Sequence, residues 1–238
     1  MPTTPPWLLT RPAVNFTLHC SDKSNTPPEI FKHCFYELCH EFKNYYRIFT
    51  DGFKEGHRVA AAVVHRDNTK YVRLPDTASI FRAELYAIML AIDVVRRSKE
   101  KNFVIFSDSM SGLQSISGFN LDSDLVQKDY TILEKNGKNI TLYWIPSHVG
   151  ILGNEKADAA AKSALSLPVT RMKLPATCMY PRITKLILDE WQELWNCCAG
   201  NKLHATVGDY KQKTCLSRRD SVLLNRLRIG HTRLGKKR

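Results

Sequence analysis

The sequence predicts an α/β domain whose core is a five-stranded mixed sheet with helices on both faces. Three consecutive segments between residues 45 and 76 are rich in β-branched and aromatic residues and are separated by short polar links, which is typical of a strand meander. A long segment with helical periodicity follows at residues 79–98. From there to residue 165, strand-like and helix-like segments alternate, and this order favours strands added beside the meander with helices covering the sheet.

The first strand is predicted at residues 45–51, where an aromatic and β-branched run ends on Asp51 and Gly52. A carboxylate at a strand end is held rigidly at the edge of the sheet, and the glycine beside it allows backbone or ligand to approach closely. Asp-Gly after a strand is also typical of a plain hairpin turn. This alternative remains open unless other carboxylates converge on Asp51.

The next two strands are predicted at residues 58–65 and 69–76, joined by a polar link of hairpin length. Ser79 has the position of an N-cap for the helix at 79–98, whose apolar residues recur on one face. The continuous apolar run at 103–106 predicts a strand buried on both faces.

The remaining elements of the core follow the strand at 103–106. A helix begins near Ser109, and a second helix is expected at residues 123–135. A fifth strand is predicted at 140–145, and an alanine-rich helix at 154–165 completes the domain.

We expect three regions along the chain. Residues 1–42 form a lead-in whose prolines disfavour regular helix or internal sheet, except for a short amphipathic helix at 29–42. Residues 43–167 form the α/β core, and residues 168–238 form a basic helical tail.

The tail contains 15 of the 35 basic residues and 5 of the 23 acidic ones, so most of the net charge of +12 lies there. It is therefore the natural element to bind a polyanion, with a solvated basic surface as the alternative. Helices are predicted at 182–198 and 217–234, and core packing is the expected role of Trp191 and Trp195.

Composition excludes several classes of protein. No run reaches the length of a membrane span, and the proline-rich start lacks the charge and hydropathy pattern of a secretory signal. Seven scattered cysteines without a Cys-x-x-Cys pair indicate neither a disulfide scaffold nor a regular zinc site. We expect an intracellular protein, in cytoplasm or nucleus, and no feature indicates a homo-oligomer.

Four carboxylates stand at element ends or on faces of small residues: Asp51, Glu84, Asp108 and Asp158. One such residue alone is usually a helix cap or a solvated side chain. Four are harder to explain in this way, because the ends of neighbouring parallel strands fall on the same side of a sheet.

The segments that contain these residues resemble the type 1 ribonuclease H family, in the order of that family. They are IFTDG at 48–52, FRAEL at 81–85, FSDS at 106–109 and PSHVGILGNEKADAAAK at 146–162. The last segment, the proline-rich lead-in and LRIGHTRL at 227–234 are similar to the C-terminal part of arthropod non-LTR retrotransposon polyproteins. Because a cysteine/histidine stretch often follows in those relatives, the chain is consistent with a fragment.

The resemblance implies a ribonuclease H-like fold and hydrolysis of the RNA strand of an RNA/DNA hybrid by two Mg²⁺ ions, with Mn²⁺ as an alternative metal. By matched position, Asp51 would bridge both ions. Glu84 and Asp108 would hold the ion on the nucleophile side, and Asp158 the other. Hard carboxylate oxygens suit magnesium.

The resemblance also implies roles outside the metal ligands. His148 would shuttle a proton near the leaving group or assist product release. Contacts with nucleic acid are expected from Gly52, Ser109 and Asn154, and a support role from Glu155. A reverse transcriptase in a parent polyprotein is the implied partner.

Two departures from the family leave other functions open. Phe53 replaces the serine that usually follows Asp-Gly, and the lysine-rich extra helix of some cellular members is absent between Asp108 and His148. A folded but catalytically idle nucleic-acid-binding remnant is therefore the main alternative. An integrase-like DNA enzyme is a weaker one, which the complete carboxylate set disfavours.

Overall fold

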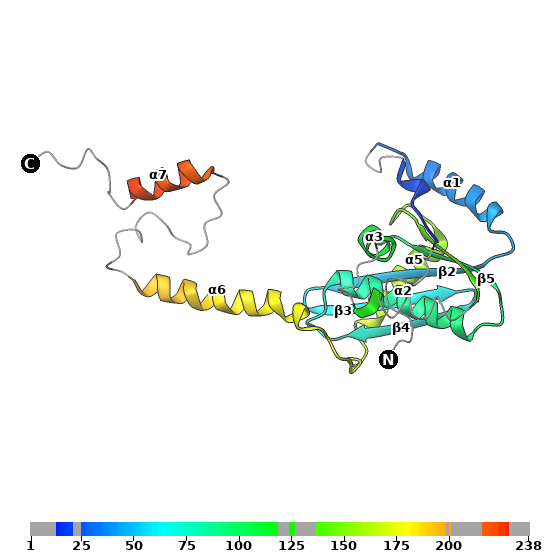
Figure 1. The fold of residues 1–238 in the computed structure, drawn as a ribbon. Helices are drawn as coiled ribbons and strands as arrows, with labels where there is room; N and C mark the ends of the chain where they lie inside the picture. Colours follow the sequence, from blue (N-terminus) through cyan, green and yellow to red (C-terminus); the bar gives the residue numbers. More distant parts are fainter. Residues whose placement is uncertain are drawn as a thin grey trace, which may run out of the picture. The chain divides into compact units, whose positions relative to one another are not determined.

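The computed structural model describes residues 13–20, 25–118, 124–126, 137–198, 200 and 216–228. The chain divides into two compact units, Met1–Pro175 and Ala176–Arg238 (Figure 1). The domain boundaries predicted at residues 42 and 167 stay predictions. Among the described residues, no helix combines the length and the apolar character that crossing a membrane requires.

Unit 1 contains one mixed sheet in the order β1-β6-β5-β2-β3-β4. The five predicted strands are confirmed, as are the antiparallel meander and the parallel pairing of β5 with β2 and β6. The strands are β1 Ala13–Asn15, β2 Tyr46–Glu55, β3 Arg58–His65, β4 Asn68–Leu74, β5 Asn102–Ser107 and β6 Asn139–Trp144.

The sixth strand, β1, comes from the lead-in for which no strand was predicted. It pairs in parallel with β6 from Ala13 to Asn15. As an edge strand it is paired on one side only, so a proline-rich neighbourhood is compatible with it. The prediction that the lead-in forms no internal strand is correct, but the prediction missed this short edge strand.

Helices cover both faces of the sheet, as predicted (Figure 1). Ser79 caps α2 by accepting a hydrogen bond from the Arg82 backbone N–H at 3.1 Å. Of the helix predicted at 123–135, only residues 124–126 are described, and these are helical. The other described helices of unit 1 are α1 Pro28–Glu41, α2 Ile80–Arg97, α3 Met110–Ser117 and α5 Leu152–Ala164, together with the 3₁₀ turn η2 Thr17–Cys20.

Alternation along the strands assigns each helix to a face. In β3, Ala61 packs with residues of α2, whereas Ala60 and Ala62 pack with residues of α5. In β5, Val104 and Phe106 pack with α1, so α1 and α5 share the face opposite α2. All four residues of the predicted buried strand, 103–106, have no exposed surface.

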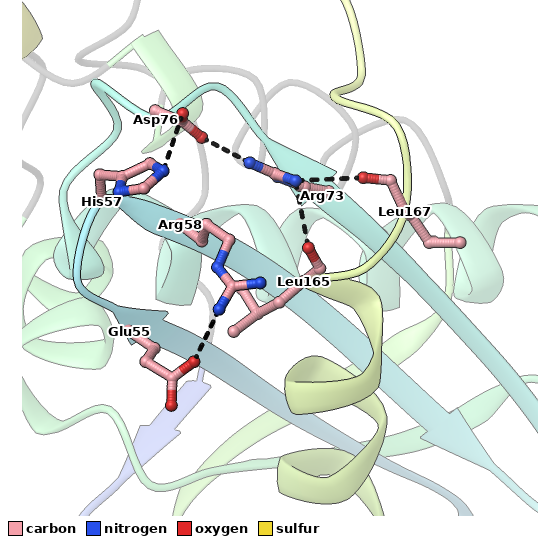
Figure 2. A network of polar contacts seen from close by, with 7 residues as sticks. All are labelled: Glu55, His57, Arg58, Arg73, Asp76, Leu165 and Leu167. Atoms are coloured by element: carbon pink, nitrogen blue, oxygen red, sulfur yellow. Dashed lines mark hydrogen bonds and ion pairs between the residues drawn. The ribbon is translucent and has the colours of Figure 1, made fainter.

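The C-terminal end of α5 is fixed to the edge strand β4 by Arg73 (Figure 2). One guanidinium nitrogen donates to the backbone carbonyl oxygens of Leu165 and Leu167 at 3.1 and 3.4 Å, and the other donates to Asp76 at 3.0 Å. A cation at a helix C-terminus is favourable, because the last carbonyls have no partner within the helix. This contact helps to set the position of α5 on the sheet.

Unit 2 contains the short turn η3 Ala176–Met179, α6 Tyr180–Cys197 and α7 Arg218–Arg228. Both predicted tail helices are therefore present, although residues 229–234 lie outside the described part. Within unit 2, α6 has no buried residue and Trp191 is 48% exposed. Core packing of Trp191 and Trp195, the role expected from the sequence, stays a prediction. Periodicity detects an apolar helix face, but it does not reveal whether a partner covers that face.

Candidate active site

The sequence predicts that the first strand ends at Asp51, and this prediction is wrong. β2 continues through Asp51 to Glu55, because residues 49–55 pair with β3 and close a hairpin. The Asp-Gly turn is excluded for the same reason. What ends at this point is the parallel neighbour β5, whose last pair with β2 is Thr50 with Ser107.

This register brings two carboxylates together. Asp51 and Asp108 are the residues that follow the last parallel pair, so Asp108, just beyond the end of β5, stands beside Asp51 of β2. Glu84 joins them from the first turns of α2. One oxygen of each of the three carboxylates lies within 4.8 Å of the others.

Gly52 explains how Glu84 reaches the sheet. Its backbone N–H donates to Glu84 Oε2 at 3.1 Å. A Cβ at Gly52 would lie 2.6 Å from the Glu84 backbone nitrogen and 2.8 Å from the Ala83 carbonyl carbon, so only glycine allows α2 to pack this closely. The structure thus gives Gly52 a packing role. The contact with nucleic acid that was expected for Gly52 stays a prediction.

Asn154 holds Asp108 from the opposite face of the sheet. Its Nδ2 donates to Asp108 Oδ2 at 3.1 Å, and its side chain is buried. Ser109 is also buried, and its hydroxyl caps α3 by accepting from the Gly112 N–H at 3.2 Å. The nucleic-acid contacts expected from these two residues stay predictions, and both have structural partners here.

His148, Glu155 and Asp158 form a second group, with one ligand atom of each within 4.8 Å of the others. Asp158 also pairs with Lys162 Nζ at 2.6 Å, one turn further along α5. The charge of Asp158 adds to the rise in the pKa of Asp51 that burial mainly causes, and it also contributes to the raised pKa of Asp108. The two groups are thus electrostatically coupled.

The loop that contains His148 packs against α1. His148 and Gly150 both have positive φ, at 55° and 78°. Val149 and Ile151 are buried in one cluster with Phe31 and Phe35 of α1. Because a non-glycine residue at positive φ is strained, the surrounding packing has to hold this loop in place.

Burial and mutual repulsion perturb the three clustered carboxyls. Burial is the largest cause in each case. The pKa of Asp51 is raised to about 8, with further contributions from the charges of Asp108 and Asp158. The pKa of Glu84 is raised well above its ordinary value by burial and by the charges of Asp108 and Asp51. The pKa of Asp108 is also raised, although the Asn154 hydrogen bond opposes the shift.

These shifts predict how the metal-free protein responds to pH. A carboxyl group with a raised folded pKa favours the folded state below its unfolded pKa, and it loses that contribution as the pH rises toward the folded pKa. For Asp51 the window runs from pH 3.8 to about 8. In EDTA, we expect the thermal midpoint of the wild type to fall across this window, relative to that of an Asp51→Asn variant. We expect Mg²⁺ to raise the wild-type midpoint more at pH 8 than at pH 5. A midpoint difference that stays constant with pH would contradict the shift.

The residues present fit a divalent cation. Asp51 is 6% exposed, and its Oδ2 is buried without a hydrogen-bond partner among the residues that the structure describes. A buried carboxylate oxygen in this state is costly unless a cation or proton satisfies it. Converging carboxylates supply the hard oxygen ligands that Mg²⁺ and Mn²⁺ prefer.

Comparison with known proteins agrees with this geometry. The RNase H family model matches residues 43–166, which is more than half of the chain. The chain belongs to the RNase H family. The matched segment contains all four carboxylates and His148, and it begins after α1.

Individual relatives also match this RNase H chain, each over less than half of its own length. Ribonuclease H1 of Homo sapiens is 27% identical over 105 residues, covering 38% of this chain and 37% of the human protein. Ribonuclease H1 of Rattus norvegicus is 28% identical over 105 residues, with the same coverage. The Pol polyprotein of equine infectious anemia virus (isolate 1369) is 36% identical over 119 residues, covering 48% of this chain and 10% of the polyprotein.

Phe53, the departure from the family pattern, has a packing role in this RNase H domain. Its ring contacts the alanines of β3 and α5 that form the interface between the sheet and the helix, and Lys162 Nζ lies 5.1 Å from the ring centroid. The substitution therefore leaves the Asp51 backbone in its strand. It also helps to position Lys162 beside Asp158.

Sequence reasoning missed three residues near the site. Lys162 belongs to a quoted motif, and its i, i+4 spacing from Asp158 was a usable signal. Arg82 binds Asp124 with two hydrogen bonds of 2.8 and 3.0 Å, but no local pattern links these residues. Lys32 of α1 lies against Gly150, where an added Cβ would meet its Nζ at 2.7 Å, and only the tertiary fold reveals this contact.

Proposed function

We propose that this RNase H domain cleaves the RNA strand of RNA/DNA hybrids endonucleolytically, using two divalent cations. The observation that supports the proposal best is the convergence of Asp51, Glu84 and Asp108 at the end of β5, within a chain of the RNase H family. The raised pKa values support it too, because carboxylates that repel one another in the metal-free protein are relieved by a bound cation.

Asp51 would bridge the two cations, with Glu84 and Asp108 on the nucleophile side and Asp158 on the other. When bound, such ions lower the pKa of a water molecule and stabilise the charge that develops on the phosphate. Gly52 and Asn154 hold Glu84 and Asp108 in place through the hydrogen bonds described above. Burial of Asp51 keeps bulk water away from that carboxylate and so strengthens its interactions.

A substrate comparison tests this activity. RNA is distinguished from DNA through its 2′-hydroxyls and through the shape of the duplex, so we expect cleavage of RNA/DNA hybrid but not of RNA/RNA or DNA/DNA duplexes, with little sequence preference. Cleavage of DNA/DNA at a similar rate would favour the integrase-like alternative. Hybrid binding without cleavage, in Mg²⁺ and in Mn²⁺, would favour the catalytically idle remnant.

His148 is proposed to move a proton near the leaving 3′-oxygen or to assist product release. Its exposed side chain lies beside Glu155 and Asp158, in the glycine-containing loop before α5. We expect His148→Ala to slow turnover by on the order of a hundredfold, with hybrid affinity little changed. A single-turnover rate equal to wild type with a slower steady state would assign His148 to product release. Wild-type rates in both experiments would remove it from the mechanism.

Unit 2 is proposed to strengthen binding to the hybrid. Residues 176–238 contain 13 lysines and arginines but 5 acidic residues. Deletion should begin at residue 176, because the Thr170 backbone N–H donates to the Arg73 carbonyl at 2.9 Å and Met172 packs on the core. We expect weaker hybrid affinity, a flatter dependence on salt, and an unchanged rate at saturating substrate. An unchanged salt dependence would show that the basic residues of unit 2 do not bind the phosphates of the hybrid, and would leave them a role in solubility.

We further propose that the chain is part of a retrotransposon polyprotein of the non-LTR type, in which a reverse transcriptase is the functional partner. The similarity to a viral Pol polyprotein supports a polyprotein origin. The motif at 146–162 and the segment at 227–234 support the narrower, arthropod-like assignment. In that setting, the RNase H domain would remove the RNA template from newly made hybrid.

A further inference from the structure

A basic pocket lies on unit 1, away from the clustered carboxylates. It has a volume of about 480 Å³ and is formed by the α1–β2 connection, the start of β2, the end of β3 and the first turn of α5. Its lining combines cations with aromatic rings and contains a single carboxylate. Its cations are Lys43, Arg47, Arg66 and Lys156, and its aromatic residues are Tyr45, Tyr46 and Phe49.

This pocket and the carboxylates lie on opposite flanks of α5. Leu152, Gly153 and Lys156 line the pocket, whereas Asn154 and Asp158 point to the metal-ligand groups. With about 100° of rotation per residue, these two sets fall on opposite sides of the helix, separated by the buried alanines that face the sheet. Gly153 packs directly on the Phe49 ring, which closes the space under the helix. The pocket is therefore a separate site.

Two guanidinium groups of the pocket are held in fixed positions. Arg66 donates to Glu100 at 3.1 Å, and its guanidinium carbon lies 4.3 Å from the centroid of the Tyr46 ring. Arg47 donates to the Cys39 carbonyl at 2.6 Å. Each arginine keeps further N–H donors beyond these contacts, because a guanidinium has five. Fixed donors of this kind lose little entropy when they bind a phosphate.

The two lysines of the pocket have no such partner. Lys43 and Lys156 are exposed, and neither forms an ion pair with any residue that the structure describes. Four cations thus surround the pocket with Glu100 as the one acidic residue in the lining. The excess of positive charge matches an anion. The half-buried rings of Tyr45 and Phe49 add apolar surface beside it.

We propose that this pocket binds a phosphate of a single-stranded nucleic-acid segment, with Lys43 and Lys156 contacting the phosphate and the aromatic residues contacting the nucleotide. A cationic groove with aromatic side chains is the arrangement that suits single strands, because every base has a face that can stack. The site lies outside the proposed catalytic residues. Binding at this pocket does not depend on hybrid cleavage, so the proposal can be tested with single-stranded DNA, which is not expected to be cleaved.

The first test measures binding of a short fluorescent oligothymidylate to the full chain in EDTA. In the double variant Lys43→Gln with Lys156→Gln, we expect affinity to fall roughly tenfold and the slope of log K against log salt to decrease by about 0.7, the value for one lost phosphate contact on a single strand. A charge-matched control, Lys70→Gln with Lys99→Gln, removes exposed cations that do not line the pocket. Equal losses in both double variants would overturn the proposal.

Two further arms identify the ligand and the place. Pyrophosphate and thymidine monophosphate are tested as competitors, and we expect each to compete only at far higher concentration than the oligonucleotide. Competition at equal concentration would reduce the pocket to a small-anion site and overturn the nucleic-acid assignment.

Photo-crosslinking with 5-iodouracil in the oligonucleotide needs no substitution, so it remains decisive if a variant misfolds. We expect adducts on Tyr45, Tyr46 or Phe49. Adducts confined to aromatic residues outside the pocket, such as Trp191 in α6, would place the strand elsewhere and overturn the proposal.

Discussion

Asp51→Asn is expected to abolish hybrid cleavage while raising the thermal midpoint of the metal-free protein. The substitution removes the charge of the carboxylate proposed to bridge both cations, and such ions supply several kcal/mol of transition-state stabilisation. The rate should therefore fall on the order of a thousandfold or more. Stability should rise because Asp51 is 6% exposed and repels Asp108, which is why its pKa is raised to about 8.

The rise in midpoint should grow with pH from 3.8 and reach its full size near pH 8, the folded pKa of wild-type Asp51. Each kcal/mol is worth about 2 to 4 °C in a chain of this size. Asp67→Asn is the matched control, since Asp67 is exposed in the hairpin between β3 and β4 and should change neither rate nor midpoint. Full cleavage by Asp51→Asn would show that the carboxylate group is structural.

Gly52→Ala is expected to lower both stability and activity, although it adds only one methyl group. The new Cβ would lie 2.6 Å from the Glu84 nitrogen, and backbone atoms of a helix cannot move aside as a flexible side chain can. Displacement of α2 would break the hydrogen bond from Gly52 to Glu84 and shift Glu84 away from Asp51 and Asp108. Overpacking of this kind costs about 1 to 3 kcal/mol. A shift of 1 Å at a catalytic group costs on the order of a hundredfold in rate.

Gly200→Ala provides the comparison, because a Cβ at Gly200 meets no atom within 4 Å. Denaturant unfolding and single-turnover cleavage should separate the two variants clearly. Wild-type stability and rate in Gly52→Ala would contradict the close packing of α2 on β2.

The sequence was sufficient for the parts of the fold that periodicity and chain order control. Neighbouring parallel strands end at the same edge of a sheet, so the proximity of Asp51 and Asp108 could be expected from the sequence alone. The Ser79 cap and the buried strand at 103–106 follow from local chemistry, and both are confirmed. The four carboxylates were identified by their positions, although their roles remain proposals.

The errors arose where contacts between distant segments decide the outcome. Asp51 was expected to end its strand, but hairpin pairing with β3 extends β2 by four residues beyond it. β1 forms only because β6 offers an open edge. The packing of α1 under the His148 loop joins residues more than a hundred positions apart, and no local pattern encodes such a contact.

The strand that is cut and the ends that are left provide the most direct test of a carboxylate-bound, metal-dependent hydrolysis. The full chain is incubated with an RNA/DNA hybrid labelled in both strands, with Mg²⁺ or with EDTA, and the product termini are identified by mass spectrometry. Hybrid specificity predicts cuts in the RNA strand only. Metal-dependent attack by water, with the 3′-oxygen as the leaving group, predicts 5′-phosphate and 3′-hydroxyl ends and no cleavage in EDTA. Cleavage that persists in EDTA and leaves 2′,3′-cyclic phosphates, or cuts in the DNA strand, would contradict the proposed function.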